Sequence, residues 1–163
     1  MGDKKTGNFD FGFIKADLTL GSRIKNNLFR LTYSHASNEF NGNIFDKSTN
    51  FQFRWNKILN EDHSLFFFFQ TGESIRAFID ERTLIGFGYR HHLYKKNKNY
   101  LDLAVGPFRE FEAYPAYSFE NVDYESSSQK TTRISFNIFA SLKLFENIST
   151  STTLYSQWKY NEI

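Results

Sequence analysis

Apolar and polar residues alternate with a period of two along most of this 163-residue chain. In residues 49–57 the odd positions Phe51, Phe53 and Trp55 are aromatic, and the even positions are polar. In a β-strand these two sets of side chains point to opposite faces of the sheet. The spacing of three and four residues that marks an amphipathic helix is not evident in any window. The alternation therefore predicts an all-β fold.

Polar breaks divide the alternating segments into eight predicted strands. They cover residues 9–20, 27–34, 49–57, 65–71, 83–94, 100–112, 132–144 and 150–160. Consecutive strands that follow one another without helices are typical of an antiparallel up-and-down sheet. We expect the connections to alternate in length. They are short at 21–26, 59–64, 95–99 and 145–149, long at 35–48 and 113–130, and intermediate at 72–82.

Alternating short and long connections are typical of bacterial outer-membrane barrels, which have tight periplasmic turns and longer external loops. A strand needs roughly 9–11 residues to cross a bilayer at a tilt, and a closed sheet satisfies its backbone polar groups in lipid. We therefore expect an all-β, antiparallel, up-and-down transmembrane β-barrel in the bacterial outer membrane.

The ends of the predicted sheet suggest a fragment of a larger barrel. The first strand begins and the last strand finishes on the side of the long connections, and no aromatic residue closes the chain at Ile163. We expect a single domain over residues 1–163, with about eight strands of a ten- to twelve-stranded barrel. Residues 1–8 are expected to be disordered or the remnant of a preceding loop. They lack the apolar core of a signal peptide.

Alternation alone does not decide which face points outwards, but three features favour a polar interior. Opposite charges share the polar faces, small Gly and Ser residues suit a crowded lumen, and Trp and Tyr lie where an interfacial girdle would need them. The predicted lumen-lining residues are Arg30, Arg54, Arg90, Asp102, Glu110, Glu112, Arg133, Asn137 and Lys143. The predicted lipid-facing residues are Phe51, Phe53, Ile85, Phe87, Leu103, Ile134, Phe136 and Ile138. The predicted aromatic girdle is Tyr33, Trp55, Trp158 and Tyr160.

Composition excludes several classes of protein. The chain has no Cys, which excludes disulfide scaffolds and Cys-ligated metals. Its formal net charge of +2 gives no reason to expect a nucleic-acid partner. Its longest apolar run is Leu65–Phe69, too short for a helix that spans a bilayer. Aromatic residues make up 19% of the chain, and this content excludes intrinsic disorder. The expected partners are outer-membrane lipid and a small polar solute or ion.

No catalytic motif organises the polar residues. His91 and His92 are adjacent on one strand and point to opposite faces, so together they cannot chelate one metal. The Gly86–Gly88 segment lies within a strand and no helix follows it, which excludes a phosphate cradle. We expect no enzyme activity and no cofactor, and either a structural role or a narrow polar channel.

Two other functions are also compatible with the sequence. A soluble lipocalin-like barrel would direct the aromatic face inwards and bind an apolar ligand. A barrel enzyme that acts on lipid would need a nucleophile and a base. His35, beside a Ser- and Asn-rich segment, is the candidate base.

Residues 82–112 resemble the salt-induced outer-membrane protein family, a family of unknown function. A glycine-bearing strand ends in Tyr89-Arg90, a short polar turn follows at 95–99, and a Leu-rich strand leads to Gly106-Pro107. Glu110 and Glu112 lie beyond that step. The order of the other strands is also similar to that of the family. The resemblance implies an outer-membrane barrel and supplies no activity.

Overall fold

The structure, a computed structural model, describes residues 10–96, 99–119, 122–145 and 147–160, and the described chain is almost entirely β-strand. The segment 1–8, expected to be disordered, lies outside the described residues. The strands are β1 (Phe11–Ile24), β2 (Asn27–Phe40), β3 (Asn43–Ile58), β4 (His63–Ser74), β5 (Ile79–Lys96), β6 (Asn99–Tyr114), β7 (Tyr117–Phe119), β8 (Val122–Tyr124), β9 (Ser127–Phe145) and β10 (Ile148–Lys159).

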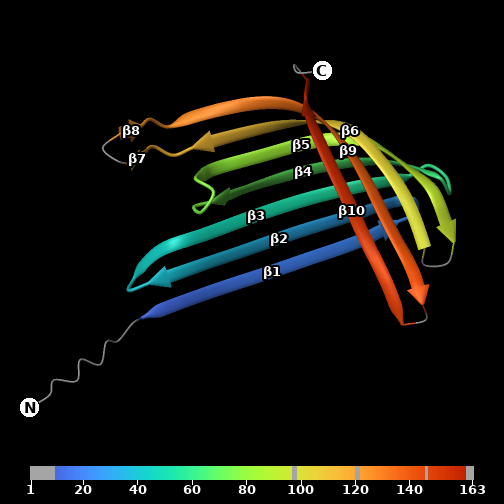
Figure 1. Cartoon of the computed structure of the whole chain (residues 1–163), viewed down its shortest axis with the longest axis horizontal. Helices are drawn as coiled ribbons and strands as arrows, with labels where there is room; N and C mark the ends of the chain where they lie inside the picture. Colours follow the sequence, from blue (N-terminus) through green and yellow to red (C-terminus); the bar gives the residue numbers. More distant parts are fainter. Residues whose placement is uncertain (1–9, 97–98, 120–121, 146, 161–163) are drawn as a thin grey trace, which may run out of the picture.

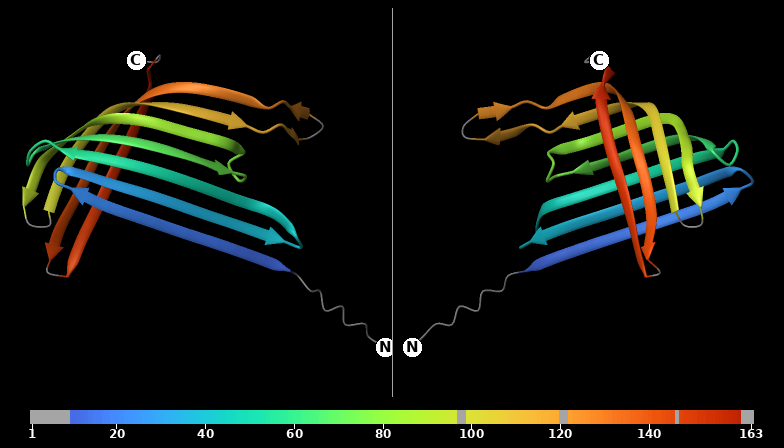
Figure 2. Two further views of the ribbon diagram at one scale, coloured as in Figure 1. Left: turned by 180° about the vertical axis from the view of Figure 1, so that it is seen from behind. Right: turned by 45° about the vertical axis from the view of Figure 1, so that its right-hand side comes forward.

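Eight long strands form one antiparallel sheet in the order β1-β2-β3-β4-β5-β6-β9-β10. Each strand pairs with its neighbours in the chain, except that the small hairpin β7–β8 is inserted between β6 and β9. The sheet bends into a half-barrel, with β10 crossing in front of β1–β4 in the view of Figure 1 and the strands curving in an arch in Figure 2. The predicted all-β, up-and-down sheet and its eight strands are thus confirmed. Within the described chain, β1 and β10 are the two edges of the sheet.

The predicted alternation of loop lengths is wrong. Strands β2 and β3 run on through the expected loop 35–48 and leave only Asn41 and Gly42 between them. The two turn residues have positive φ angles of 49° and 79°. Such angles are those of a two-residue hairpin turn, and Asn-Gly is the sequence that favours it. The connection 75–78 is also tight. Only 115–126 is long, and it contains the β7–β8 hairpin.

The bend of the sheet depends on large residues that face glycines across the strands. Phe66 is paired with Gly88, and Phe68 with Gly86. A Cβ atom added at Gly86 would lie 2.5 Å from the Phe68 ring, and one at Gly88 would lie 2.4 Å from the Phe66 ring. The rings therefore occupy the space above the glycines, an arrangement that allows a sheet to curve.

Candidate functional site

The two faces of the bent sheet carry different residues. Residues directly opposite each other in neighbouring strands share a face. One such row runs across the sheet as Arg30, Arg54, Phe68, Gly86, Phe108 and Arg133. Residues of this face from β3, β4, β5, β6, β9 and β10 line a single cavity, so it is the concave face of the half-barrel.

The structure places all nine residues predicted to line a lumen on strand positions of the concave face. Eight of them lie near the cavity or in the ionic contacts described below. Lys143 does not join them. It is exposed near the end of β9, where its backbone N–H donates a hydrogen bond to Asn99 Oδ1 (2.7 Å).

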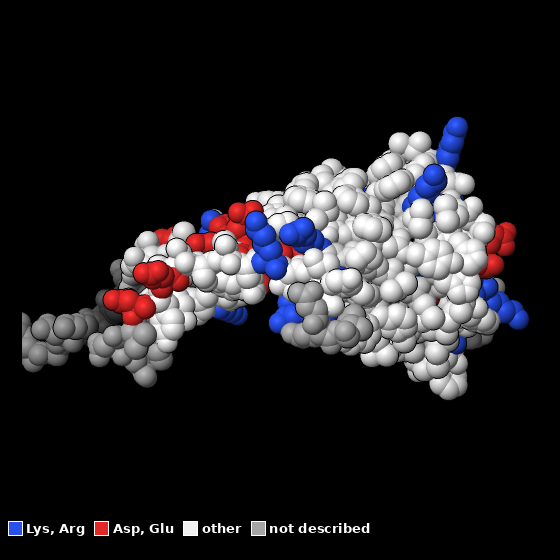
Figure 3. Space-filling model, turned by 90° about the horizontal axis from the view of Figure 1, so that it is seen from above, with Lys and Arg blue, Asp and Glu red and all other residues white. Residues whose placement is uncertain are grey.

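The eight residues predicted to face lipid lie on the convex face. For example, Phe53 on β3 and Ile85 on β5 each lie opposite Phe69 of β4, one on either side of it. No described residue covers the convex face, and several of its large apolar side chains are exposed: Phe87 by 64%, Leu154 by 60% and Val105 by 45%. Six of the eight are half-buried: Phe51, Phe53, Leu103, Ile134, Phe136 and Ile138. In Figure 3, which views the outer side of the bend, Lys, Arg, Asp and Glu lie along the narrow left-hand part as far as the middle and at the right-hand end, and the stretch between these two groups is mostly uncharged.

Three of the four residues predicted for an aromatic girdle lie at strand ends. Trp55 lies near the end of β3, Trp158 lies near the end of β10, and Tyr160 directly follows β10. Tyr33, expected near a strand end, lies in the middle of β2. The reason is that β2 continues to Phe40 through the segment that the sequence suggested was a loop.

Four charged residues form a balanced ionic network on β5, β6 and β9. Glu110 is 1% exposed. It accepts hydrogen bonds from Arg82 Nε (2.8 Å) and from Arg133 Nε (2.7 Å). Arg82 also pairs with Glu112 (3.0 Å), and the other carboxylate oxygen of Glu112 accepts from Tyr114 Oη (2.6 Å) and Gln129 Nε2 (2.7 Å). Two guanidinium groups thus meet two carboxylates, and these ion pairs join β5, β6 and β9.

A second group of charges lies further along the concave face. Asp102 Oδ1 lies 2.7 Å from His92 Nδ1, and Asp102 Oδ2 lies 4.0 Å from Arg90. The Arg90 guanidinium also stacks over the Phe139 ring, 4.8 Å from its centroid. His92 therefore acts with Asp102 on the concave face and not with its neighbour His91.

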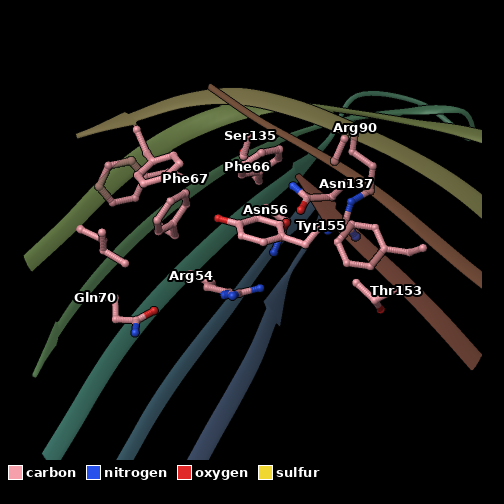
Figure 4. A pocket seen from close by; sticks show the side chains of 15 residues that line it. Arg54, Asn56, Phe66, Phe67, Gln70, Arg90, Ser135, Asn137, Thr153 and Tyr155 are labelled. Atoms are coloured by element: carbon pink, nitrogen blue, oxygen red, sulfur yellow. The ribbon is translucent and has the colours of Figure 1, made fainter. Parts of the chain in front are cut away.

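Arg54 projects into a cavity of about 280 Å³ on the concave face. Figure 4 shows Arg54, Asn56 and Tyr155 close together over the sheet, with Gln70 on one side and Asn137 and Arg90 on the other. Phe66, Phe68, Phe108 and Phe139 also contribute to the lining. The cavity is thus aromatic in its walls and polar at several points, and its charged groups are cationic.

One cluster was missed at the level of sequence. His63 of β4 pairs with His91 of β5, the rings stack at 4.7 Å, and their Nδ1 atoms lie 3.1 Å apart. The hydroxyl of Tyr89 hydrogen-bonds to His63. Only the register of β4 against β5 brings these residues together, because His63 and His91 are 28 positions apart in the chain.

The candidate base His35 lies on β2 and contacts Thr49 Oγ1 (3.1 Å), which in turn donates to Glu73 Oε1 (3.0 Å). The acid therefore contacts the hydroxyl and does not orient the imidazole, unlike the order in a hydrolytic triad. The described residues contain no group of three or more His, Cys, Asp or Glu that could hold a metal ion. That part of the chain also contains no helix long and apolar enough to cross a membrane.

No family model, curated protein or solved structure matches this chain. The resemblance to the salt-induced outer-membrane protein family therefore stays a prediction.

Proposed function

We propose that this chain forms the wall of an outer-membrane β-barrel whose convex face contacts lipid and whose concave face lines a narrow polar passage. The observation that carries the proposal is the orientation of the side chains. Large apolar residues such as Phe87 and Leu154 are exposed on the outside, whereas Glu110, Asp102 and Glu112 are buried on the inside. A protein that folds in water normally has the opposite arrangement.

Lipid explains the convex face better than water does. An apolar surface that extends over eight strands is unfavourable in water and is typical of a site covered by another apolar phase. The long strands have 12 to 19 residues, more than the roughly 9–11 needed to cross a bilayer at a tilt. In lipid the backbone groups along β1 and β10 must also be paired, so the proposal requires that strands close the barrel at both edges.

The concave face supports a double role. The balanced network around Glu110 fixes β5, β6 and β9 to one another, which is a structural role. The cavity at Arg54 has polar groups at several points of an aromatic wall and is lined by residues of six strands, which is the position of a solute passage. We therefore assign bracing to the paired charges and passage to the cavity.

A soluble barrel that binds an apolar ligand is the alternative, and one observation favours it. Phe66, Phe68, Phe108 and Phe139 lie on the concave face, where they could contact such a ligand. The alternative leaves the exposed convex face unexplained.

The membrane proposal is tested by placing one charge on the convex face. Phe87→Arg in protein folded into lipid vesicles should lower the free energy of unfolding by about 2–4 kcal/mol, because an arginine near the bilayer midplane is costly. The matched control is Ile44→Arg, since Ile44 is also exposed but lies on β3 next to the 41–42 turn. It should change the free energy of unfolding by less than about 1 kcal/mol. Denaturant titration of both variants gives the comparison.

Two results would decide against the proposal. A wild-type chain that is monodisperse and folded in buffer without detergent, with Phe87→Arg equally stable, would contradict contact with lipid. If the protein inserts into planar bilayers and no conductance is measured, the proposed passage is wrong and only the structural role remains. Step conductances that change in Arg90→Glu would support the passage.

A further inference from the structure

We propose that the concave cavity binds small organic carboxylates through Arg54, with Arg90 beside it. This rests on the proposed passage and adds the chemical class of its solute. The binding measurement does not require insertion into a bilayer, because binding at the cavity can be measured on the folded protein in detergent.

The first support is the lack of an acidic partner for Arg54. Arg30 lies directly opposite Arg54 in the register of β2 with β3, and both Arg30 and Arg90 act on Arg54 with like charge. Among the described residues, no carboxylate lies within ion-pair distance of Arg54. The Nε atoms of Arg54 and Arg90 are buried without a hydrogen-bond partner in the described structure. A buried donor without an acceptor is unfavourable, so this cluster is suited to receive an anion.

The second support is the contrast with the network around Glu110. There, Arg82 and Arg133 face Glu110 and Glu112, so the charges are equal in number. In the cluster of Arg30, Arg54 and Arg90 the one carboxylate is Asp102, which lies 4.0 Å from Arg90 and is hydrogen-bonded to His92. The two groups share one face, yet only the second has an excess of positive charge. Ion pairs that stabilise the sheet account for the network around Glu110, but they do not account for the cluster of Arg30, Arg54 and Arg90.

The shape of the cavity defines the ligand. Its volume is about 280 Å³, which admits a small molecule only. The guanidinium group is planar and presents donors that match a carboxylate in pairs. The rings of Phe66, Phe68 and Phe139 offer an apolar wall beside it, and Asn137 and Tyr155 supply further polar contacts. A small aromatic carboxylate combines the anionic group and the apolar body that this lining requires, and inorganic phosphate lacks the second.

Benzoate is the probe for this inference. Isothermal titration calorimetry on the folded full chain in zwitterionic detergent should detect benzoate, with benzamide as the neutral analogue and inorganic phosphate as the anion without a ring. We expect benzoate to bind about tenfold or more tightly than benzamide, because the charged group gains the charge-assisted hydrogen bonds. Phosphate should bind more weakly than benzoate. If phosphate binds as tightly as benzoate, the aromatic class is wrong.

Three variants separate the site from general charge effects. Arg54→Gln should weaken benzoate binding about tenfold or more. Asp102→Asn keeps the shape of the side chain and removes the one carboxylate of the cluster, so it should strengthen binding severalfold. Arg76→Gln removes the same charge from an exposed side chain that pairs with Asp46 outside the cavity, so it should leave affinity unchanged. The opposite signs at Arg54 and Asp102 do not depend on small losses of stability.

The inference is overturned if benzamide binds as tightly as benzoate, or if Arg54→Gln and Arg76→Gln bind benzoate equally well. A failure of the proposed passage gives a different result from a failure of the binding inference. In that case benzoate binds to the detergent-folded chain with the expected dependence on Arg54, and the protein neither inserts into bilayers nor conducts.

Discussion

At the scale of single residues, Glu110 is the least exposed of the buried charged groups that the structure describes. Its carboxylate is almost fully buried and joins β6 to β5 through Arg82 and to β9 through Arg133. Removal of one member of a buried ionic group leaves the remaining charges without compensation, and this is more destabilising than the loss of a surface pair.

Glu110→Gln should therefore lower the free energy of unfolding by about 3 kcal/mol, because Arg82 and Arg133 lose the carboxylate that both contact. Glu125→Gln is the matched control, since Glu125 is exposed in the connection before β9. This control should change the free energy of unfolding by less than about 0.5 kcal/mol. Denaturant titration measures both values. Equal stabilities for the two variants would show that the network does not brace the sheet.

A second prediction for a single residue concerns the contribution of Glu73 to stability at low pH. Glu73 lies at the end of β4 beside the 75–78 turn, outside the part of the strand proposed to cross lipid. Hydrogen bonds from Lys47 and from Thr49 hold the pKa of the Glu73 carboxyl below its ordinary value of 4.5. A carboxylate with a lowered pKa in the folded state binds fewer protons there than in the unfolded state. Its contribution to stability is therefore complete above about pH 4.5 and is lost as the pH falls through the folded pKa.

The difference in unfolding free energy between the wild type and Glu73→Gln should therefore be constant near neutral pH and should shrink below about pH 4.5. The Glu73 side chain is 40% exposed. The effect is small, because solvent screens such a pair. Denaturant titrations across a pH series measure it. A difference that grows as the pH falls would contradict the assigned direction.

At the scale of elements, the turn between β2 and β3 decides the length of both strands. Gly42 has a φ of 79°, a conformation that β-branched residues rarely adopt. Gly42→Val should destabilise the protein by about 1–3 kcal/mol through backbone strain. Gly21→Val is the control, because a Cβ at Gly21 meets no atom closer than 3.9 Å and its φ is not positive. Thermal or denaturant unfolding of both variants checks the prediction, and equal effects would exclude turn strain as the cause.

The same turn shows what could be predicted from the sequence. Alternation identified the eight strands and their order, because the period of two is a local property of the chain. The expected loop 35–48 was wrong, although Asn41-Gly42 is a strong hairpin signal, because its many Ser and Asn residues suggested a loop. Those Ser and Asn residues belong to the parts of β2 and β3 that continue beyond the apolar stretch. In these parts polar residues occur on both faces of the sheet, so alternation no longer marks the strand.

The candidate site was predictable only in part. The alternation separated Arg54, Arg90 and Asp102 from the apolar positions, so their common face followed from parity. The pairing of His92 with Asp102 and the stacking of His63 on His91 depend on the register of β4, β5 and β6, which alternation does not define. The difference between the balanced and the cationic cluster likewise requires distances between side chains.

At the scale of the whole molecule, the half-barrel combines two faces and two open edges. The bend places the charged residues on the concave side, where they can compensate one another, and leaves the apolar residues on the convex side. It does not join β1 to β10 in the described chain, so each of these strands has one side without a neighbour. Stability should therefore fall from the centre of the sheet towards its edges.

Hydrogen exchange tests this gradient. The strands β5 and β6 have neighbours on both sides, so we expect their amides to exchange slowest. In an antiparallel edge strand every second N–H points away from the partner, so alternate amides of β1 and of β10 should exchange at rates close to those of the turns. Mass spectrometry or NMR gives the rates on the isolated chain in detergent, shown to be monomeric by sedimentation, in which no further strand pairs with β1 or β10. Uniform protection along β1 would contradict an open edge, because every N–H group of that strand would then have an acceptor.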